Sequence, residues 1–161
     1  EGDFFYVAIA GTESVRDVLM DANIFTINGR HAGFFQRAQL VERMIRDNIV
    51  YQIANGKTMI NCGHSAGGIV SVFIHEKWVN VSHSVSWGAP KGFALFAKPR
   101  SKSFSHARYV HGQDAVPKFL LTYHHEQTEK YLLGQSDALL PNFDEHHMEY
   151  YLEDMKKLRK A

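Results

Sequence analysis

Short apolar runs alternate with segments of helical period along this 161-residue chain. The apolar runs are rich in β-branched and aromatic residues, as buried strands are. Strands that alternate with helices pair in parallel, and helices then cover both faces of their sheet. The pattern therefore predicts an α/β fold with a mainly parallel central sheet. The predicted strands are 4–10, 57–62, 81–87, 107–110 and 119–123, and the predicted helices are 14–25, 33–53, 69–78 and 147–158.

The length and composition of the chain predict one soluble domain over residues 1–161, without a linker or internal repeat. The formal net charge is +1, so we expect no nucleic-acid partner, because such partners demand a basic surface. The single cysteine, Cys62, cannot form a disulfide within the chain. No apolar run reaches the ~20 residues that span a bilayer, and no signal peptide is visible. These features leave the cellular compartment unassigned.

The pentapeptide Gly-His-Ser-Ala-Gly lies between the predicted strand 57–62 and the predicted helix 69–78. In that setting it is typical of a nucleophile elbow, where a serine sits on a strained turn that exposes its hydroxyl. Glycines flank the serine because a Cβ two positions away would collide with neighbouring backbone. We therefore predict that Ser65 is a nucleophile. The other elbow residues are Gly63, His64 and Gly67.

A serine nucleophile needs a histidine to accept its proton and a carboxylate to orient that histidine. Asp114 follows the predicted strand 107–110, at the strand end where such sheets place functional groups. Its rivals Asp137 and Asp144 have no predicted strand directly before them. The chain order Ser, Asp, His leaves four candidate bases, which are His124, His125, His146 and His147. Position at the start of the last helix favours the final pair, and spacing alone does not choose between its two members.

Seven short motifs follow one another in order between Tyr6 and Leu152. They are Val-Ala-Ile-Ala-Gly-Thr (7–12), Asp-Val-Leu (17–19), His-Ala-Gly-Phe (31–34), Gly-His-Ser-Ala-Gly-Gly (63–68), Gly-Ala-Pro (88–90), Asp-Ala-Val-Pro (114–117) and His-Met-Glu-Tyr (147–150). In this order the chain resembles the class 3 (fungal-type) lipase family of the α/β-hydrolase superfamily. The resemblance implies a compact α/β-hydrolase fold.

The resemblance also implies a role for particular residues. The implied catalytic residues are Ser65 as nucleophile, Asp114 as acid and His147 as base, with His146 as the fallback base. The backbone N–H groups of Thr12 and Ala66 would hold the oxyanion, where fixed donors stabilise developing negative charge. The segment 14–25 corresponds to a lid, whose apolar residues are Val15, Val18 and Leu19. No cofactor and no metal are implied.

The chain departs from the family pattern in three respects. Ala10 stands where the family usually has arginine, the family's disulfides are missing, and the resemblance begins at the predicted oxyanion strand, without the family's usual N-terminal elements. The expected function is hydrolysis of carboxylic esters through an acyl-serine intermediate. We expect acylglycerols or related lipid esters as substrates, as in a lipase, esterase or phospholipase, with transient contact to a lipid surface. The alternatives are an inactive lipid-binding or scaffolding domain and an acyltransferase that uses the same residues.

Overall fold

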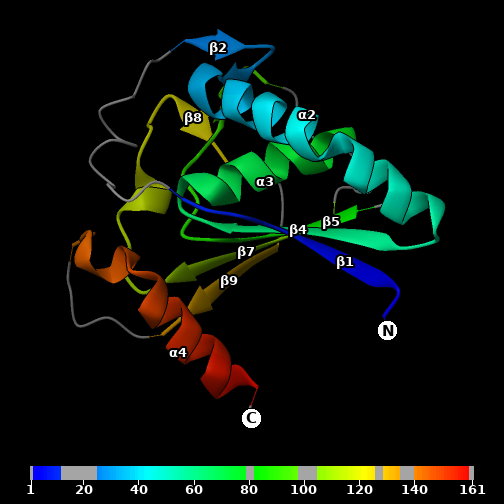
Figure 1. The fold of residues 1–161 in the computed structure, drawn as a ribbon. Helices are drawn as coiled ribbons and strands as arrows, with labels where there is room; N and C mark the ends of the chain where they lie inside the picture. The colour runs from blue at the N-terminus through cyan, green and yellow to red at the C-terminus, as the bar shows by residue number, and fades with distance from the viewer. Residues whose placement is uncertain are drawn as a thin grey trace.

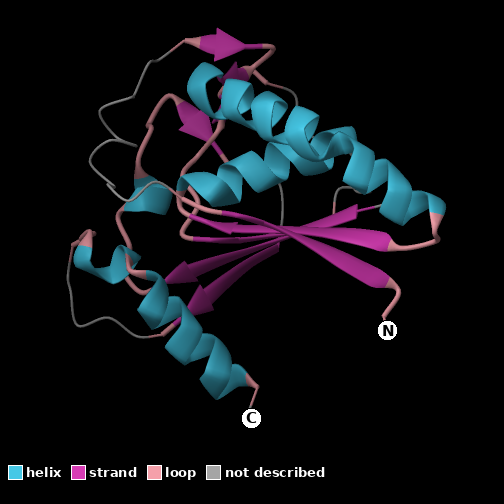
Figure 2. Ribbon diagram, in the orientation of Figure 1, coloured by secondary structure: helices cyan, strands magenta, loops and turns pink. Residues whose placement is uncertain are grey.

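A five-stranded parallel sheet forms the centre of the computed structural model (Figures 1 and 2). The structure describes residues 2–11, 25–78, 82–97, 105–125, 129–134 and 140–159. In sheet order, the strands are β1 (Phe4–Ile9), β4 (Thr58–His64), β5 (Ser82–Trp87), β7 (His106–His111) and β9 (Glu129–Leu133). Every neighbouring pair in this sheet is parallel. The predicted α/β class with a mainly parallel sheet is therefore confirmed.

Helices lie on both faces of the sheet, as expected (Figure 1). The long helix α2 (Ala32–Ala54) and the helix α3 (Ala66–Lys77) cover one face, and α4 (Met148–Leu158) lies on the other face beside β7 and β9. Residues 66–75 of α3 are all buried, because this helix is sandwiched between the sheet and α2. None of the described helices is long and apolar enough to cross a membrane.

The core lies on the side of the sheet that the helices α2 and α3 cover. Met59 of β4, Ile49 of α2 and Val70 of α3 are at most 1% exposed and belong to one cluster of buried side chains. Full burial of an apolar side chain of this size stabilises a fold by about 1.5–3 kcal/mol. This packing fixes the orientation of α3 on the sheet. It thereby fixes the turn from which α3 starts.

A second, antiparallel sheet of short strands was not predicted. Its order is β2 (Thr26–Ile27), β3 (Arg30–His31), β6 (Phe93–Ala94) and β8 (Tyr123–His124). Strands of two residues leave too little alternation of apolar and polar residues to be recognised in a sequence. Their pairing depends on contacts between distant parts of the chain.

Two other predictions differ from the structure. The predicted strand 119–123 is wrong except at Tyr123, the first residue of β8, because a 3-10 helix, Val116–Lys118, precedes it and Leu120 adopts a φ of 63°. That conformation breaks an extended run. The strand β9 was missed, although it pairs with β7 at the sheet edge. Of the predicted helix 14–25, all but the last residue lies outside the described residues.

Candidate active site

Ser65 occupies the turn between β4 and α3 with φ 55° and ψ −132°. Positive φ is uncommon for a residue other than glycine, and at such a turn it indicates backbone strain. Two backbone hydrogen bonds hold the turn. The Ser65 N–H donates to the Trp87 carbonyl at 2.9 Å, and the Ser65 carbonyl accepts from the Gly68 N–H at 2.9 Å. Ser65 thus has the local geometry that the elbow motif predicts.

The elbow glycines allow α3 to start directly against the sheet. A Cβ on Gly63 would collide with the backbone of Gly67, and a Cβ on Gly67 would collide with the carbonyl of Ile9 in β1. At Gly68, a Cβ would lie 2.8 Å from the Cβ of Ala89. Any side chain at these positions would therefore push α3 away from β4 and β1.

Asp114 and His146 form a buried acid–base pair. Asp114 is fully buried in the loop after β7, and its Oδ2 accepts a hydrogen bond from His146 Nδ1 at 2.8 Å. The same oxygen accepts the Tyr151 hydroxyl at 2.5 Å, and Oδ1 accepts the Val116 N–H at 2.9 Å. The carboxylate is therefore held on both oxygens. It leaves His146 Nε2 as the ring nitrogen that can receive a proton from another group.

The structure pairs Asp114 with His146 and leaves His147 exposed. This differs from the resemblance, which implied His147 as the base and His146 only as the fallback. His146 ends the 3-10 helix Asp144–His146, and its ring is buried at 2% exposure. His147 is the N-cap of α4 with extended backbone. Because successive residues at a helix start point in different directions, only one of the two histidines reaches the carboxylate.

The remaining candidates lie away from this pair or outside the described residues. His124 Nδ1 bonds the His125 carbonyl at 2.6 Å, and His125 Nε2 bonds the Pro117 carbonyl at 2.7 Å. Asp144 is exposed. Asp137 lies outside the described residues.

The acid–base pair and the elbow meet through His64, the residue before Ser65. The His64 ring stacks on the His146 ring, with ring centres 4.5 Å apart and an interplanar angle of 29°. Ser65 Oγ and His146 Nε2 are both buried, and neither has a hydrogen-bond partner among the described residues. The structure therefore does not join these two atoms directly. Hydrogen bonds between a nucleophile and its base are often long in free enzymes and tighten only when substrate binds.

Tyr151 is a site residue that the sequence reasoning missed. Burial, and after it the negative charge of Asp114, raises the pKa of the Tyr151 hydroxyl far above its usual value. Tyr151 therefore stays protonated and remains a donor to the carboxylate. The available signal was its place on the buried side of the predicted helix 147–158, since a buried tyrosine needs a partner for its hydroxyl.

A second histidine–carboxylate contact anchors α4, the helix that carries Tyr151. His111 Nδ1 lies 2.6 Å from Asp154 Oδ2, and Lys157 Nζ lies 3.1 Å from Asp154 Oδ1. Burial raises the pKa of Asp154, but the hydrogen bonds from Lys157 and His111 outweigh burial and lower it. Because His111 precedes the Asp114 loop by three residues, this contact fixes α4 relative to that loop.

One predicted oxyanion donor lies within the described residues. Ala66 is the first residue of α3, and the first N–H groups of a helix have no acceptor within the helix. A Cβ on Gly11 would lie 2.9 Å from the carbonyl oxygen of His64 and 3.2 Å from the Cβ of Ser65, so the predicted oxyanion loop starts against the elbow. The other predicted donor, Thr12, and the predicted lid residues Val15, Val18 and Leu19 lie outside the described residues.

Arg37 of α2 contacts the strand end that leads into this loop. Its Nη2 donates a hydrogen bond to the carbonyl of Ala10 at 3.0 Å. Ala10 is the position where the resembling family usually has arginine. A guanidinium from a different element therefore lies near that position in this chain.

The comparison with solved structures identifies the fold. The triacylglyceride lipase of Rhizomucor miehei matches with a TM-score of 0.69 at 18% identity, covering 81% of this chain and 57% of that chain. Lip2 lipase from Yarrowia lipolytica matches with a TM-score of 0.65 at 20% identity, covering 81% of this chain and 57% of that one. The mono- and diacylglycerol lipase of Aspergillus oryzae matches with a TM-score of 0.64 at 19% identity, covering 90% of this chain and 60% of that one.

This chain has the fold of the fungal class 3 lipases. It spans 57% to 60% of the length of the three lipase chains just described. No protein-family model matches the sequence, and no curated protein matches it. The similarity to the class 3 lipases is therefore one of structure.

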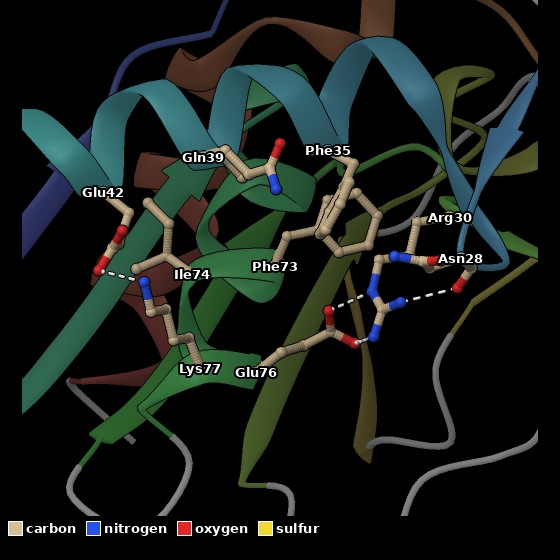
Figure 3. Close-up of a pocket in the computed structure, with 10 residues that line it drawn as sticks. Asn28, Arg30, Phe35, Gln39, Glu42, Phe73, Ile74, Glu76 and Lys77 are labelled. Atoms are coloured by element: carbon tan, nitrogen blue, oxygen red, sulfur yellow. Dashed lines mark hydrogen bonds and ion pairs between the residues drawn. The ribbon is translucent and has the colours of Figure 1, made fainter.

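A hollow of about 400 Å³ lies between α2 and α3 (Figure 3). None of the residues that line it is a predicted site residue. Two ion pairs border it, Arg30 with Glu76 at 2.5 Å and Lys77 with Glu42 at 2.9 Å. The Arg30 guanidinium also lies 5.3 Å from the centre of the Phe35 ring. Because each of these four charged side chains is paired with another, the hollow offers a charged ligand no specific partner. Among the described residues, no three His, Cys, Asp or Glu side chains gather as metal ligands.

Proposed function

We propose that this chain is a serine hydrolase of carboxylic esters that works through an acyl-serine intermediate. In this proposal Ser65 is the nucleophile, His146 is the base and Asp114 orients the base. The observation that carries the proposal is the meeting of two features. The strained turn at Ser65 lies against the buried Asp114–His146 pair, through the stacked ring that precedes Ser65.

The reaction follows from the chemistry of these groups. His146 Nε2 takes the proton of Ser65 Oγ while Oγ bonds to the carbonyl carbon of the ester. Asp114 stabilises the imidazolium that forms, and the N–H groups of Ala66 and Thr12 stabilise the negative oxygen. The imidazolium then gives its proton to the leaving alcohol as the C–O bond breaks. Water attacks the acyl-serine in the same way and releases the acid.

Exposed apolar side chains near the acid and base support a lipid ester as substrate. Phe119 and Leu121, beyond the Asp114 loop, are 39% and 85% exposed, and Leu140 and Phe143, before His146, are 76% and 40% exposed. The centres of the Phe119 and Phe143 rings lie 5.2 Å apart, so these two side chains form a shared apolar surface between the two loops. Such surfaces often bind lipid or apolar ligands. We therefore propose acylglycerols or related lipid esters as substrates, with transient contact to a lipid surface.

The catalytic proposal is tested by substitution of Ser65. The Ser65→Ala variant should hydrolyse a short p-nitrophenyl ester roughly 10⁴- to 10⁶-fold more slowly than the wild type. Ser105→Ala is the matched control, because this serine is exposed and its hydroxyl bonds the ring of His83, which is also exposed, and it should keep wild-type turnover. Activity in a folded Ser65→Ala variant would contradict the mechanism. An inactive wild type would favour a lipid-binding or scaffolding domain, and ester products formed with an added alcohol would indicate acyl transfer.

The substrate proposal is tested with a panel of esters of increasing acyl length, on which a lipid hydrolase should accept the long-chain members. It is also tested with two variants on an emulsified ester. Leu121→Gln should lower the rate on an emulsified long-chain ester about fivefold, because one exposed apolar contact to the lipid is lost. Met44→Gln is the matched control, since Met44 is 75% exposed on α2, on the other side of the sheet from α4. Equal rates for the two variants on the emulsion would exclude these loops as the lipid contact.

A further inference from the structure

His64 contacts the proposed base but has no place in the reaction as derived above. It is the last residue of β4, and its ring centre lies 4.5 Å from that of His146 and 5.6 Å from that of Tyr151. The ring of Tyr151 meets it edge-on, at an interplanar angle of 63°. One face of the His146 imidazole is therefore covered by another ring.

Burial and the neighbouring His146 keep His64 uncharged near neutral pH. The titratable groups that face it are His146, Asp114, Tyr151 and Glu149. Burial, and after it the charge of His146, lowers the pKa of His64 to about 4, although the two carboxylates and the His146 backbone oppose this shift. A neutral ring does not repel the imidazolium that the reaction would form. A cation in the same position would.

We propose that His64 is a positioning residue, whose stacked ring holds the His146 imidazole in one orientation with Nε2 toward Ser65. This inference rests on the proposed function. The Asp114 hydrogen bond fixes one nitrogen of the ring, but a single bond leaves the ring free to tilt about it. The stack on His64 restrains that tilt and keeps water from the covered face. Such restraint matters because a displacement of about 1 Å in a reacting group can cost roughly 100-fold in rate.

The first test removes the ring and then restores it. His64→Ala should lower kcat on a short p-nitrophenyl ester roughly 10- to 100-fold and leave KM within about twofold, because the ring acts on the base and not on the substrate. His64→Phe should recover most of the loss, since phenylalanine supplies a ring without a titrating group. His83→Ala is the matched control, a histidine on the neighbouring strand that is exposed and whose ring bonds the Ser105 hydroxyl.

The second test places a charge beside the base. In His64→Lys the ammonium would oppose protonation of His146, so the acid limb of the kcat/KM profile should move to lower pH by about one unit relative to His64→Phe. Because the size of this shift depends on the distance between residue 64 and the base, it tests the stacked geometry on which the positioning role rests. The test also works if His64→Ala fails to fold, because it compares two larger side chains.

Different results would overturn the proposed function and the positioning role of His64. Wild-type activity that survives Ser65→Ala would overturn the proposed function itself. If activity depends on Ser65 but His64→Ala keeps wild-type kcat, or changes only KM, the positioning role is wrong. An acid limb that is the same in the Lys and Phe variants would also overturn the positioning role.

Discussion

Gly88 tests the placement of the acid and the base, because it follows β5 and faces both of them. Its φ is 58°. An added Cβ would lie 2.8 Å from Asp114 Oδ2, 2.9 Å from His146 Cε1 and 2.9 Å from the Tyr151 hydroxyl. All three groups belong to one buried hydrogen-bonded cluster, so none can move aside alone. Gly88→Ala should therefore strain the backbone and also push the acid–base pair apart.

The size of the effect follows from these two contributions. Left-handed backbone costs a residue with a Cβ about 1–2 kcal/mol, and an extra methyl group in a packed site costs about 1–3 kcal/mol. We expect Gly88→Ala to lower the free energy of unfolding by roughly 2–5 kcal/mol. Gly56→Ala is the control, since Gly56 has a φ of 79° and an added Cβ there would meet nothing within 4 Å. It should show the backbone cost of about 1–2 kcal/mol alone.

Urea unfolding and ester hydrolysis measure the two consequences separately. The kcat of Gly88→Ala should fall by about 100-fold or more, because the base is displaced from the nucleophile. Gly56→Ala should keep wild-type kcat. Equal unfolding free energies in the two variants, together with wild-type kcat in Gly88→Ala, would refute this placement of the acid–base pair.

Three further predictions concern groups around the site and the core. Tyr151→Phe removes a hydrogen bond to the Asp114 carboxylate and should lower the free energy of unfolding by about 1.5–3 kcal/mol, as urea melts would measure; unaltered stability would mean that this bond is absent in solution. Arg37→Met removes the hydrogen bond that α2 donates to the Ala10 carbonyl, next to the predicted oxyanion loop. Steady-state kinetics should show kcat reduced roughly three- to tenfold with KM constant; a change in KM alone would count against a role at that loop. Burial, helped by the charge of Arg108, lowers the pKa of His106 to about 3, so below pH 6.5 the unfolded chain binds a proton that the folded protein does not, and stability falls as pH falls. Between pH 7 and pH 5, His106→Asn should lose about 2 kcal/mol less unfolding free energy than the wild type; parallel curves would disprove the shift.

Local patterns in the sequence were sufficient to predict the elbow and the long helix. The period of apolar residues over 33–53 corresponds to α2, Ala32–Ala54, because a helix that packs on a core repeats its buried side every three to four residues. The glycines around Ser65 also carry local information, since their spacing is set by the turn itself. The position of Asp114 at the end of a strand could also be predicted, because the predicted strand 107–110 directly before it is a local pattern.

The choice between His146 and His147 could not be made from the sequence. Adjacent residues share the same local pattern, and the helix start separates their directions only once the 3-10 turn Asp144–His146 has formed. The stack on His64 and the bond to Asp114 then determine which ring is buried. Both contacts join segments more than 30 residues apart along the chain, so no local pattern records them.

The missed strand β9 and the wrong strand 119–123 have a related cause. The run Glu-Lys-Tyr-Leu-Leu of β9 is extended because β7 offers it a free edge, although its own alternation is weak. The apolar run at 119–123 is strand-like by composition, but Leu120 turns back at φ 63° and packs against the core cluster. In both segments, tertiary contacts override local preference.

Covalent labelling of the purified protein by a fluorophosphonate probe tests most directly whether His146 activates Ser65. Mass spectrometry should find one adduct, on Ser65. The labelling rate should fall at least about 100-fold in His146→Ala and stay within about twofold of wild type in His147→Ala. Modification at another residue, or loss of labelling in His147→Ala with wild-type labelling in His146→Ala, would contradict the account.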